Sequence, residues 1–478
     1  MSRRSIEPTT ASAVADLAGD AATVINGGTV VTGVSDDSRT VARGDMFFCI
    51  RGSVTDGHDA AAAAVASGAA ALVVDHVLAG VPGDVAQVVV PDVRSVVGPL
   101  VSALTGNPAS HMRMVAVTGT NGKTSTALFI AGILGAAGCR TKVMGTLTGP
   151  RTTPEPVELH SQLAEALAEG VDTVVMEVSS HALVLGRVDG IVFDVAVFTN
   201  LSRDHLDFHG TMEDYFAAKA SLFTAGRSRS AVVNTGDAHG RRIAEACTIP
   251  LATYSVADAQ DLVVGPTGVS FVWRDEHVSA PVGGRFMAEN LIAAATVASA
   301  CGVDAATVAR ACAGLGPVPG RHESVPTGGD YSVIVDYAHT PEALASLLAS
   351  VRAVAGGRVI VVFGCGGDRD RGKRPEMGAV AASGADVVIV TSDNPRTESP
   401  GAIIAEITAG MQGAGAEVET QQDRADAIAS AIGRAGSGDI VVIAGKGHEP
   451  YQEVAGVYVP FSDVEVARVA IERRSTSR

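Results

Sequence analysis

Residues that mark several protein classes are scarce in this chain. Its six cysteines form no Cys-x-x-Cys pair and no cysteine–histidine cluster of zinc-site spacing, so we expect buried thiols in a reducing compartment. Lysine and arginine total 36 against 52 aspartates and glutamates, and this net charge of −16 argues against a broad surface for nucleic acid or anionic membrane. No run approaches 18 apolar residues, so no membrane span is expected. The first residues, MSRRSIEPTT, lack the apolar segment of a secretory signal, and we therefore expect a cytoplasmic protein.

Apolar residues are nevertheless abundant and fall into short runs. Hydrophobic residues make up 46% of the chain and charged residues 18%, which is enough for buried cores and excludes a disordered chain. Runs rich in valine and isoleucine alternate with helix-length segments rich in alanine and leucine. These runs lie at residues 114–118, 173–178, 192–199, 358–363, 387–391 and 440–444. Nearly continuous apolar strands are typical of sheets covered by helices on both faces, so the sequence predicts an α/β fold with mainly parallel sheets.

The length of 478 residues indicates about three domains, at roughly 100–200 residues each. Turn-forming residues gather at 105–110 and at 314–320, which makes both segments candidate linkers. We therefore expect a small α/β domain at residues 1–110, a central domain at 111–326 and a carboxyl-terminal domain at 327–478.

The sharpest motif is the run VAVTGTNGKTS at residues 115–125. An apolar strand enters a glycine-rich turn, and a helix opens after it; main-chain N–H groups and the helix dipole at such a turn bind phosphate. Lys123 would reach the β- and γ-phosphates, and the hydroxyl of Thr124 would bind Mg²⁺. The spacing is G-x-x-G-K-T, shorter than the common phosphate-binding loop, and the alternative is an ordinary tight turn. The expected nucleotide-binding residues are Gly119, Thr120, Asn121, Gly122, Lys123, Thr124 and Ser125.

Ionisable residues follow two other predicted strands. Glu177 ends the apolar run at 173–178, where a carboxylate that faces a phosphate loop is a natural Mg²⁺ ligand, although strand-end glutamates are often caps or ion-pair partners. Five ionisable side chains lie within residues 203–209, which follow another apolar run. Such a density at the carboxyl end of a strand indicates a site rather than an ordinary loop.

Several segments together resemble the Mur ligase family. They are TGTNGKTS, MEVSSHAL, NLSRDHLDFHG, DYAHTPEAL, FGCGGDRDRGKRP, TSDNPR and AGKGHE. The resemblance extends from about residue 37 to about residue 467 and is closest to the members that add the third amino acid of the peptidoglycan stem peptide. The segments DSRTVARGDMFF and GSVTDGH are similar to the uridine-nucleotide-binding domain of that group. The resemblance implies that residues 1–110 bind the UDP substrate, 111–326 form a P-loop ATPase and 327–478 form a Rossmann-like domain for the amino acid.

The resemblance also implies a reaction. The carboxylate of UDP-N-acetylmuramoyl-L-alanyl-D-glutamate attacks the γ-phosphate of ATP, and an incoming amine displaces phosphate from the acyl phosphate. Cations must offset the repulsion between the two anions, a role that suits Lys123 and Mg²⁺ held by Thr124 and Glu177. By resemblance, His205 is another metal ligand and Lys219 is carried as a carbamate, whereas without it Lys219 would be taken for a solvated helix lysine. The implied catalytic residues are Lys123, Glu177, His205 and Lys219, and the metal-binding residues are Thr124, Glu177, His205 and Lys219.

Further binding residues are carried over from the same resemblance. The positions that match nucleotide contacts are Asn290, Arg321 and Asp336, with His339 in the same segment as Asp336. The positions that match contacts to the UDP substrate are Ser38, Thr152, Thr153, Ser179 and Arg187. The positions that match contacts to the added amino acid are Arg369, Asp393, Asn394, Arg396, Gly445 and Glu449.

The added amino acid is expected to be meso-diaminopimelate. The Arg396 guanidinium suits its distal carboxylate, whereas the ammonium of L-lysine would meet a like charge. Three departures from the family pattern, Met287, His322 and Val464, leave open a divergent paralogue, and the same chemistry with L-lysine is also an alternative. A P-loop binding module without ligase chemistry would explain residues 119–125 but not Lys219. The expected partners are these small molecules, and we expect a monomer.

Overall fold

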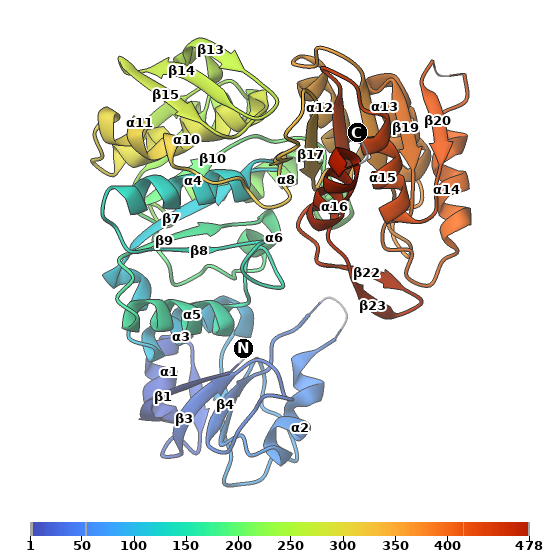
Figure 1. Cartoon of the computed structure of the whole chain (residues 1–478). Coiled ribbons are helices and arrows are strands. Elements are labelled where there is room, and N and C mark those ends of the chain that lie inside the picture. The colour runs from blue at the N-terminus through green and yellow to red at the C-terminus, as the bar shows by residue number, and fades with distance from the viewer. Residues whose placement is uncertain (1–2, 53–54, 414, 477–478) are drawn as a thin grey trace. The chain divides into compact units, whose positions relative to one another are not determined.

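The computed structural model describes residues 3–52, 55–413 and 415–476 (Figure 1). Ser53 and Val54, which belong to the GSVTDGH segment, lie outside the described residues. The chain forms two compact units. The first comprises Met1–Tyr254 and Thr296–Cys301, and the second comprises Ser255–Ala295 and Gly302–Arg478.

The amino-terminal sheet of the first unit mixes parallel and antiparallel strands. Its order is β1 (Arg3–Thr10), β3 (Val30–Ser35), β4 (Asp45–Phe48), β5 (Ala71–Val74), β6 (Ala86–Val89) and β2 (Thr23–Ile25). Strands β3 to β6 run parallel, and the edge strands β1 and β2 are antiparallel to their neighbours. Helices α1 (Ala11–Ala18) and α3 (Val93–Leu104) pack on one core, and α2 (Ala61–Ala66) on another. Because both faces are covered, β4 and β5 are buried along their whole length.

The second sheet of this unit is parallel throughout. Its order is β12 (Leu251–Tyr254), β11 (Ala231–Asn234), β10 (Val195–Phe198), β7 (Arg113–Thr118), β9 (Thr173–Glu177) and β8 (Thr141–Met144). The accompanying helices are α4 (Lys123–Ala136), α5 (Pro156–Ala168), α6 (Ser180–Val184), α7 (Leu206–His209), α8 (Met212–Ala220) and α9 (Ala238–Ala246). The chain adds β8 and β9 on one side of β7 and then β10 to β12 on the other. The carboxyl end of β7 therefore lies at the switch point of the sheet, where α/β proteins bind ligands.

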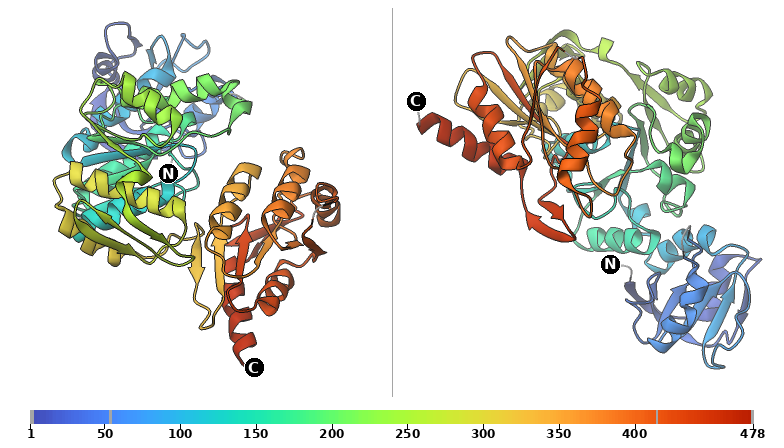
Figure 2. Two further views of the ribbon diagram at one scale, coloured as in Figure 1. Left: turned by 90° about the horizontal axis from the view of Figure 1, so that it is seen from above. Right: turned by 90° about the vertical axis from the view of Figure 1, so that its right-hand side faces the viewer.

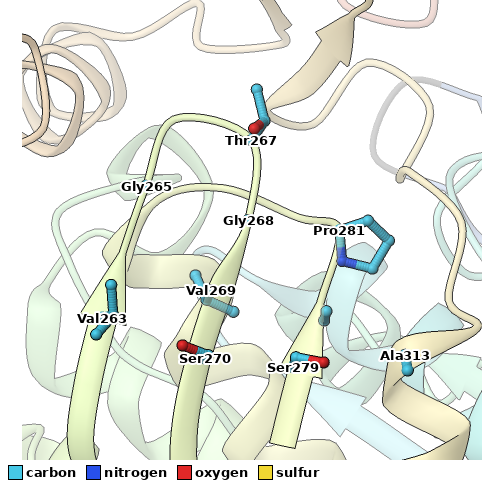
Figure 3. A pocket seen from close by; sticks show the side chains of 10 residues that line it. Val263, Gly265, Thr267, Gly268, Val269, Ser270, Ser279, Pro281 and Ala313 are labelled. Atoms are coloured by element: carbon cyan, nitrogen blue, oxygen red, sulfur yellow. The ribbon is translucent and has the colours of Figure 1, made fainter.

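A small antiparallel sheet opens the second unit. It has the order β13 (Gln260–Val264), β14 (Val269–Trp273) and β15 (Glu276–Ala280), and α10 (Arg285–Ala300) and α11 (Ala305–Ala313) follow it. A hollow of about 520 Å³ is lined by Val263, Thr267, Ser270 and Pro281 among others (Figure 3). Among the described residues that line it, no side chain is ionisable, so the hollow offers no group for acid–base or metal chemistry.

The main sheet of the second unit has the order β16 (Glu323–Val325), β17 (Ser332–Asp336), β21 (Ile440–Ala444), β18 (Val359–Phe363), β19 (Val387–Val390) and β20 (Glu417–Thr420). All strands but β16 run parallel. Helices α12 (Pro341–Arg352), α13 (Lys373–Gly384) and α14 (Pro400–Ala409) cover one face, and α15 (Arg424–Arg434) and α16 (Asp463–Thr476) cover the other (Figure 2). An exposed hairpin, β22 (Tyr451–Val454) and β23 (Val457–Pro460), follows β21.

The predicted fold class is confirmed. The apolar runs correspond to β7, β9, β10, β18, β19 and β21, and all of them lie in parallel sheets. Short 3₁₀ turns lie at η1 (Gly57–Ala60), η2 (Pro108–His111), η3 (Ser221–Phe223) and η4 (Val256–Asp258). Within the described ranges, no helix has both the length and the apolar character to cross a membrane.

Candidate active site

The turn between β7 and α4 has the backbone of a phosphate-binding loop. Gly119 has a φ of +152°, and a Cβ atom there would lie 1.9 Å from Thr199 Oγ1. Gly122 has a φ of +84° and begins α4. Lys123 Nζ donates to the carbonyl oxygens of Gly119 and Thr120 at 3.0 and 2.8 Å, so its ammonium lies against the loop that precedes it. Glycine is required where the backbone is left-handed or tightly packed, and the arrangement places a cation and a helix N-terminus at one point.

Two oxygen-bearing side chains meet beside this loop. Thr124 Oγ1 lies 3.0 Å from both carboxylate oxygens of Glu177, and Thr146 N donates to Glu177 Oε1 at 2.9 Å. The contact follows from the sheet, since β7 and β9 are neighbours and Val117 is in register with Glu177. Thr124 is 6% exposed and Glu177 is 1% exposed. A buried hydroxyl and carboxylate beside a phosphate loop are the oxygen donors that Mg²⁺ prefers.

Lys219 reaches the same loop from α8. Its Nζ donates to the carbonyl oxygen of Gly119 at 2.9 Å and lies 4.7 Å from the centre of the Tyr215 ring. The side chain is buried, so it is not a solvated helix lysine. Burial, and then the charge of Lys123, hold the pKa of Lys219 well below its usual value. The neutral amine, which is the form that adds to carbon dioxide, is therefore favoured here.

His205 lies near the loop without touching the Thr124–Glu177 pair. Among the contacts of the described residues, its ring is 6.2 Å from that of Tyr215, whose hydroxyl is 3.1 Å from Thr120 Oγ1. It has a φ of +52°, begins α7 and is half exposed. His181 packs edge-on against it at 4.8 Å, and burial, with help from neighbouring histidines, lowers the pKa of His181 to about 4. The 203–209 segment thus borders the phosphate loop with its imidazoles.

Polar residues from the segment before α5 and from the segment after β9 form a second group around Glu177. Thr153 Oγ1 donates to the main-chain oxygen of Glu177 at 2.9 Å and accepts from Ser179 N at 3.1 Å. Arg187 Nη1 donates to Thr153 O at 3.2 Å, and its Nη2 lies 2.7 Å from Glu155 Oε1. The structure therefore brings three of the five expected UDP-substrate residues into one hydrogen-bonded cluster next to the metal-ligand candidates.

The other two residues of that set are placed differently. Thr152 Oγ1 is 3.1 Å from the hydroxyl of Thr146, which also lies within hydrogen-bond distance of Glu177. Thr152 therefore contacts the group through Thr146. Ser38 lies in the loop after β3 and is half-buried. Within the described residues, none of the hydrogen bonds of this cluster extends to Ser38.

In the second unit, the expected nucleotide residues gather in part. Asp336, at the end of β17, accepts from His322 N at 2.7 Å and from Ala338 N at 2.8 Å. Its burial raises the pKa of the carboxyl group, and Arg321 opposes that shift. The Arg321 guanidinium lies 4.5 Å from the centre of the Tyr337 ring. An arginine stacked on an aromatic ring beside a carboxylate is a surface suited to a flat, charged ligand.

Asn290 lies on α10 and is buried. Its Nδ2 is 3.9 Å from Met287 Sδ, a weak contact in which the thioether takes the place of an amide partner. His339, which shares the DYAHTPEAL segment with Asp336, has Nδ1 2.9 Å from the Tyr337 carbonyl oxygen. Neither side chain is hydrogen-bonded to Asp336 in the described part of the chain.

The expected amino-acid residues lie at the carboxyl ends of β18, β19 and β21. Asn394 Nδ2 donates to Glu449 Oε2 at 2.9 Å, and Lys446 Nζ donates to Asn394 Oδ1 and to Glu449 Oε2, both at 3.0 Å. Lys446 is fully buried. Gly445 has a φ of +112°, and a Cβ there would lie 2.7 Å from Asp393 Oδ2. The ends of β19 and β21 thus supply one polar network around the buried Lys446.

Arg396 stands at the rim of this network with a carboxylate already beside it. Its Nε donates to Glu453 Oε2 at 3.1 Å and its Nη1 to Gly367 O at 2.6 Å. Glu453 belongs to the β22–β23 hairpin, and Arg396 has a φ of +52°. Arg369 is exposed, and within the described chain its guanidinium forms no hydrogen bond or ion pair. A Cβ on Gly366 would lie 3.0 Å from Arg396 Nη1 and 3.9 Å from Arg369 Cγ, so the two arginines flank one glycine.

The structure adds to these sites four residues that were not predicted from the sequence. They are Thr146, Tyr215, Lys446 and Glu453. Lys446 stands between two glycines directly after an apolar strand, a signal like that of Lys123. For Glu453 the sequence holds no comparable signal, because the hairpin that carries it folds back to Arg396 from 57 positions away.

Comparisons with known proteins agree along almost the whole chain. The Mur ligase family catalytic domain matches residues 30–104, the Mur ligase middle domain matches 117–298 and the Mur ligase glutamate ligase domain matches 320–447. A UDP-N-acetylmuramoyl-L-alanyl-D-glutamate–2,6-diaminopimelate ligase of Streptomyces coelicolor is 42% identical, over 98% of this chain and 97% of its own. One of Xanthomonas campestris is 45% identical, over 93% and 94%. A solved structure of a ligase of this name has a TM-score of 0.67 at 36% identity and covers 92% of this chain and 95% of its own.

Proposed function

Because this chain belongs to the Mur ligase family, we propose that it is an ATP-dependent ligase that adds meso-diaminopimelate to UDP-N-acetylmuramoyl-L-alanyl-D-glutamate. Relatives named for this ligation are 42–45% identical over nearly their full length. The observation that carries the proposal is the convergence of Lys123, Lys219 and the Thr124–Glu177 pair on one phosphate-binding loop. The product belongs to peptidoglycan precursor synthesis.

We divide the work among three domains. Residues 1–110 would bind the UDP portion, 111–326 would bind ATP and 327–478 would bind the amino acid. The family models that match residues 30–104, 117–298 and 320–447 support this division. A cytoplasmic location accords with it, since ATP is the energy source and all six cysteines are free thiols. We further propose that the protein is a monomer.

Activation of the carboxylate would take place at the loop of residues 119–125. A D-glutamate carboxylate oxygen attacks the γ-phosphorus, ADP leaves and an acyl phosphate forms. Loop N–H groups and the Lys123 ammonium would hold the β- and γ-phosphates, with Arg321 and Asp336 as further nucleotide contacts. The amine of the amino acid then adds to the acyl carbon, and phosphate departs with the electron pair of the C–O bond.

The donor set beside the loop fits Mg²⁺. Thr124 and Glu177 offer buried oxygen atoms within 3.0 Å of each other, and His205 would be an additional ligand. When bound, the ion would offset negative charge on the phosphates and the carboxylate. Lys219 would complete the set as a carbamate: its neutral amine nitrogen bonds to the carbon of CO₂, loses a proton and leaves a negatively charged N–COO⁻ group. The lowered pKa of Lys219 favours the neutral amine that this step needs.

Selection of the amino acid would occur at Arg396. The distal carboxylate of diaminopimelate would pair with this guanidinium and with the exposed Arg369, and Glu449 would receive the distal ammonium. L-lysine has no carboxylate at that end, so its ammonium, even beside Glu449, would lie near two arginines with no ligand carboxylate to offset their charge. The UDP substrate would contact Ser38, Thr152, Thr153, Ser179 and Arg187.

The test is a ligation assay on the purified protein. We expect phosphate release only when ATP, the UDP-dipeptide and meso-diaminopimelate are all present, with a product heavier by one diaminopimelate residue. Equal turnover with L-lysine would refute the role of Arg396 but not the ligase chemistry. ATP binding without any ligation across a panel of amino acids would favour a P-loop binding module instead.

A further inference from the structure

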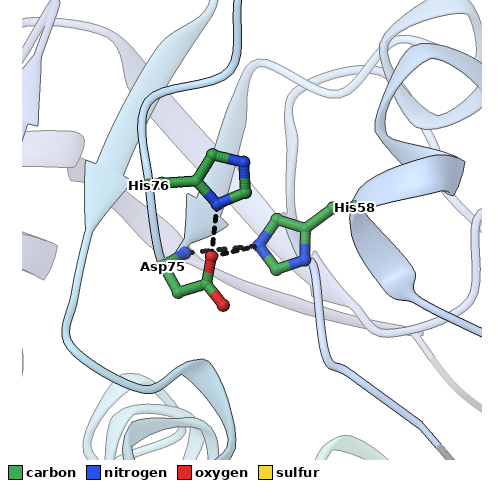
Figure 4. Close-up of side chains that lie close together, drawn as sticks. All are labelled: His58, Asp75 and His76. Atoms are coloured by element: carbon green, nitrogen blue, oxygen red, sulfur yellow. Dashed lines mark hydrogen bonds and ion pairs between the residues drawn. The ribbon is translucent and has the colours of Figure 1, made fainter.

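Two histidines and two aspartates meet at one end of the amino-terminal sheet. We propose that His58, Asp75 and His76 form a binding site for one transition-metal ion of the Zn²⁺ class (Figure 4). Each residue offers one ligand atom, and these atoms all lie within 4.8 Å of one another. None of the three residues is among the contacts proposed for the ligase substrates, and His58 is the last residue of the GSVTDGH segment in the domain proposed to bind the UDP portion.

The local fold brings these side chains together. Asp75 and His76 directly follow β5, at the carboxyl end of the parallel strands, and His58 lies in η1. Asp56 begins η1 by accepting from His58 N at 2.9 Å. The main-chain N–H of Asp75 points at His58 Nε2 at 3.3 Å, so the turn after β5 lies directly against the His58 ring. Only 7% of the His58 side chain is exposed, and the ring is therefore held in place.

Hydrogen bonding fixes which nitrogen of His58 can bind a metal. Asp56 Oδ1 lies 2.6 Å from Nδ1, so Nδ1 carries the proton and donates to the carboxylate. The Nε2 atom then holds a lone pair and lies 3.2 Å from Asp75 Oδ1, which is also an acceptor. Asp75 N also donates to Nε2, and a cation, either a proton or a metal ion, can bridge Nε2 and Oδ1. A carboxylate on the far nitrogen of a histidine is the usual outer support of a metal-bound imidazole.

The second histidine shares the same oxygen atom. His76 Nδ1 forms a 2.5 Å hydrogen bond with Asp75 Oδ1, and a metal ion bound by both atoms would replace the proton between them. The His58 and His76 rings are stacked with centres 5.1 Å apart and planes 24° apart. Two imidazole nitrogens and one carboxylate oxygen suit Zn²⁺ or Co²⁺, whereas Mg²⁺ prefers oxygen ligands alone. Because 55% of the His76 side chain is exposed, water can supply the fourth ligand.

The guanidinium of Arg51 lies near the site and affects the metal affinity that we expect. Arg51 Nε lies 2.8 Å from Asp75 Oδ2 and 3.5 Å from Asp56 Oδ2, and its Nη2 donates to Asp75 Oδ1 at 3.4 Å. The metal ion would therefore compete with Arg51 for Oδ1. Arg51 also places a positive charge near the ion, so the affinity should be lower than that of a four-ligand structural zinc site.

The experiment is a Co²⁺ titration of the full-length, chelator-treated protein with Mg²⁺ in excess, followed by visible absorption and by competition with Zn²⁺. The exposed His76 is the residue to change first, because His76→Ala leaves the buried His58 packed. We expect wild type to bind one equivalent more than His76→Ala and Asp75→Asn. Asp56→Asn, which disturbs only the outer support, should weaken binding about 10- to 100-fold.

The exposed His111, also in the first unit, gives the matched control His111→Ala, which should bind as wild type does. The histidines at 181, 205 and 209 can add a Co²⁺ site of their own, but that site is equally present in every variant. Added Zn²⁺ should also raise the melting temperature of wild type more than that of His76→Ala. Equal stoichiometry and affinity in wild type, His76→Ala and Asp75→Asn would overturn the proposal, as would an equal loss in His111→Ala.

Discussion

The site residues at the two sheet ends differ in how deeply their charged side chains are buried and in how they are paired. At the ends of β7 and β9, Thr124, Glu177 and Lys219 are at most 6% exposed and are bonded to each other or to the loop backbone. At the end of β19, the Arg396 side chain is 23% exposed and pairs with the carboxylate of Glu453. The first set is fixed before any ligand arrives, whereas the second holds its arginine with a partner that a ligand carboxylate can replace.

This difference matches the two tasks that we assign. Transition-state stabilisation needs groups that do not reorganise, and buried, fully bonded side chains meet that need. Selection of an amino acid needs a guanidinium that is neutralised while the site is empty and available once a carboxylate enters. A partly exposed ion pair is weak enough to exchange, since such pairs contribute only about 0–1 kcal/mol.

The largest effect is expected from Lys219→Ala, which breaks the buried set. The variant loses the group proposed to become a carbamate beside Mg²⁺, and a metal ligand set of this kind supplies several kcal/mol. We expect kcat to fall by at least about 10²-fold in the ligation assay, with KM for diaminopimelate little changed. Added formate or acetate should restore part of the activity, because a small carboxylate can occupy the space left by the side chain.

Lys142→Ala is the matched control for that prediction. Lys142 is a half-buried lysine of the same unit, paired with Glu169 at 3.3 Å, and its loss should leave kcat unchanged. Full activity of Lys219→Ala would show that Lys219 has no catalytic role. The contrast between the buried residues at the ends of β7 and β9 and the partly exposed Arg396 would then be lost.

Arg396→Ala should have the next largest effect, and in a different kinetic parameter. A charge-assisted hydrogen bond contributes about 1.5–3 kcal/mol, so kcat/KM for meso-diaminopimelate should fall about 10- to 100-fold, chiefly through KM. The rate with L-lysine should rise relative to diaminopimelate, because a like charge has been removed. Arg352→Ala, which breaks an exposed pair with Asp386 and a hydrogen bond to Gly384 O, is the control. A fall in kcat with unchanged KM would place Arg396 in the chemistry instead.

The buried site at the ends of β7 and β9 could be predicted almost completely from the sequence. The phosphate loop is contiguous, so its spacing is visible along the chain, and Glu177 ends an apolar run that had to lie in the same sheet. The contact with Lys219 required the resemblance, because 100 residues separate it from Gly119 and nothing in α8 marks one lysine as buried. Burial depends on packing between distant segments, which a local pattern does not contain.

The site around Arg396, at the end of β19, could be predicted only in part. The segment DNPR is visible as a turn after an apolar strand, but Arg396 owes its direction to Gly367 and to Glu453. Those contacts depend on how the β22–β23 hairpin folds back. The β13–β15 sheet was missed for a similar reason, since a short antiparallel insertion has weak signals between two long α/β patterns.

Glu453→Gln should change KM less than Arg396→Ala does, and it tests whether a ligand carboxylate replaces Glu453 at Arg396. The substitution removes a negative charge that competes with the substrate carboxylate for Arg396, while an amide oxygen can still accept the Nε–H bond. We expect KM for meso-diaminopimelate to fall about two- to fivefold, as for a partly exposed pair, and KM for L-lysine to rise. A rise in KM for diaminopimelate would show that Glu453 positions Arg396 rather than competing for it.

The smallest effect on the rate at neutral pH is expected from a pair of buried histidines, one in each unit. His160 is fully buried with Nε2 3.1 Å from Asp189 O, and His322 is 3% exposed with Nε2 3.2 Å from Pro266 O. Burial lowers the pKa of both imidazoles from 6.5 to about 4. Neutral imidazole therefore belongs to the folded form well below pH 6.5, where the unfolded chain takes up a proton.

The direction in which pH changes the stability follows from this difference in proton binding between the folded and the unfolded chain. Stability is complete above pH 6.5 and is lost as pH falls toward 4, by about 2 kcal/mol per histidine between pH 8 and pH 5. Trp273, the chain's one tryptophan, lies in the same unit as His322, so its fluorescence during urea unfolding reports on that unit. His322→Asn, which tolerates the φ of +45°, should flatten the pH dependence of the Trp273 transition. His160→Gln should leave it unchanged, and equal slopes in wild type and His322→Asn would show that buried charge in this unit is not what acid destabilises.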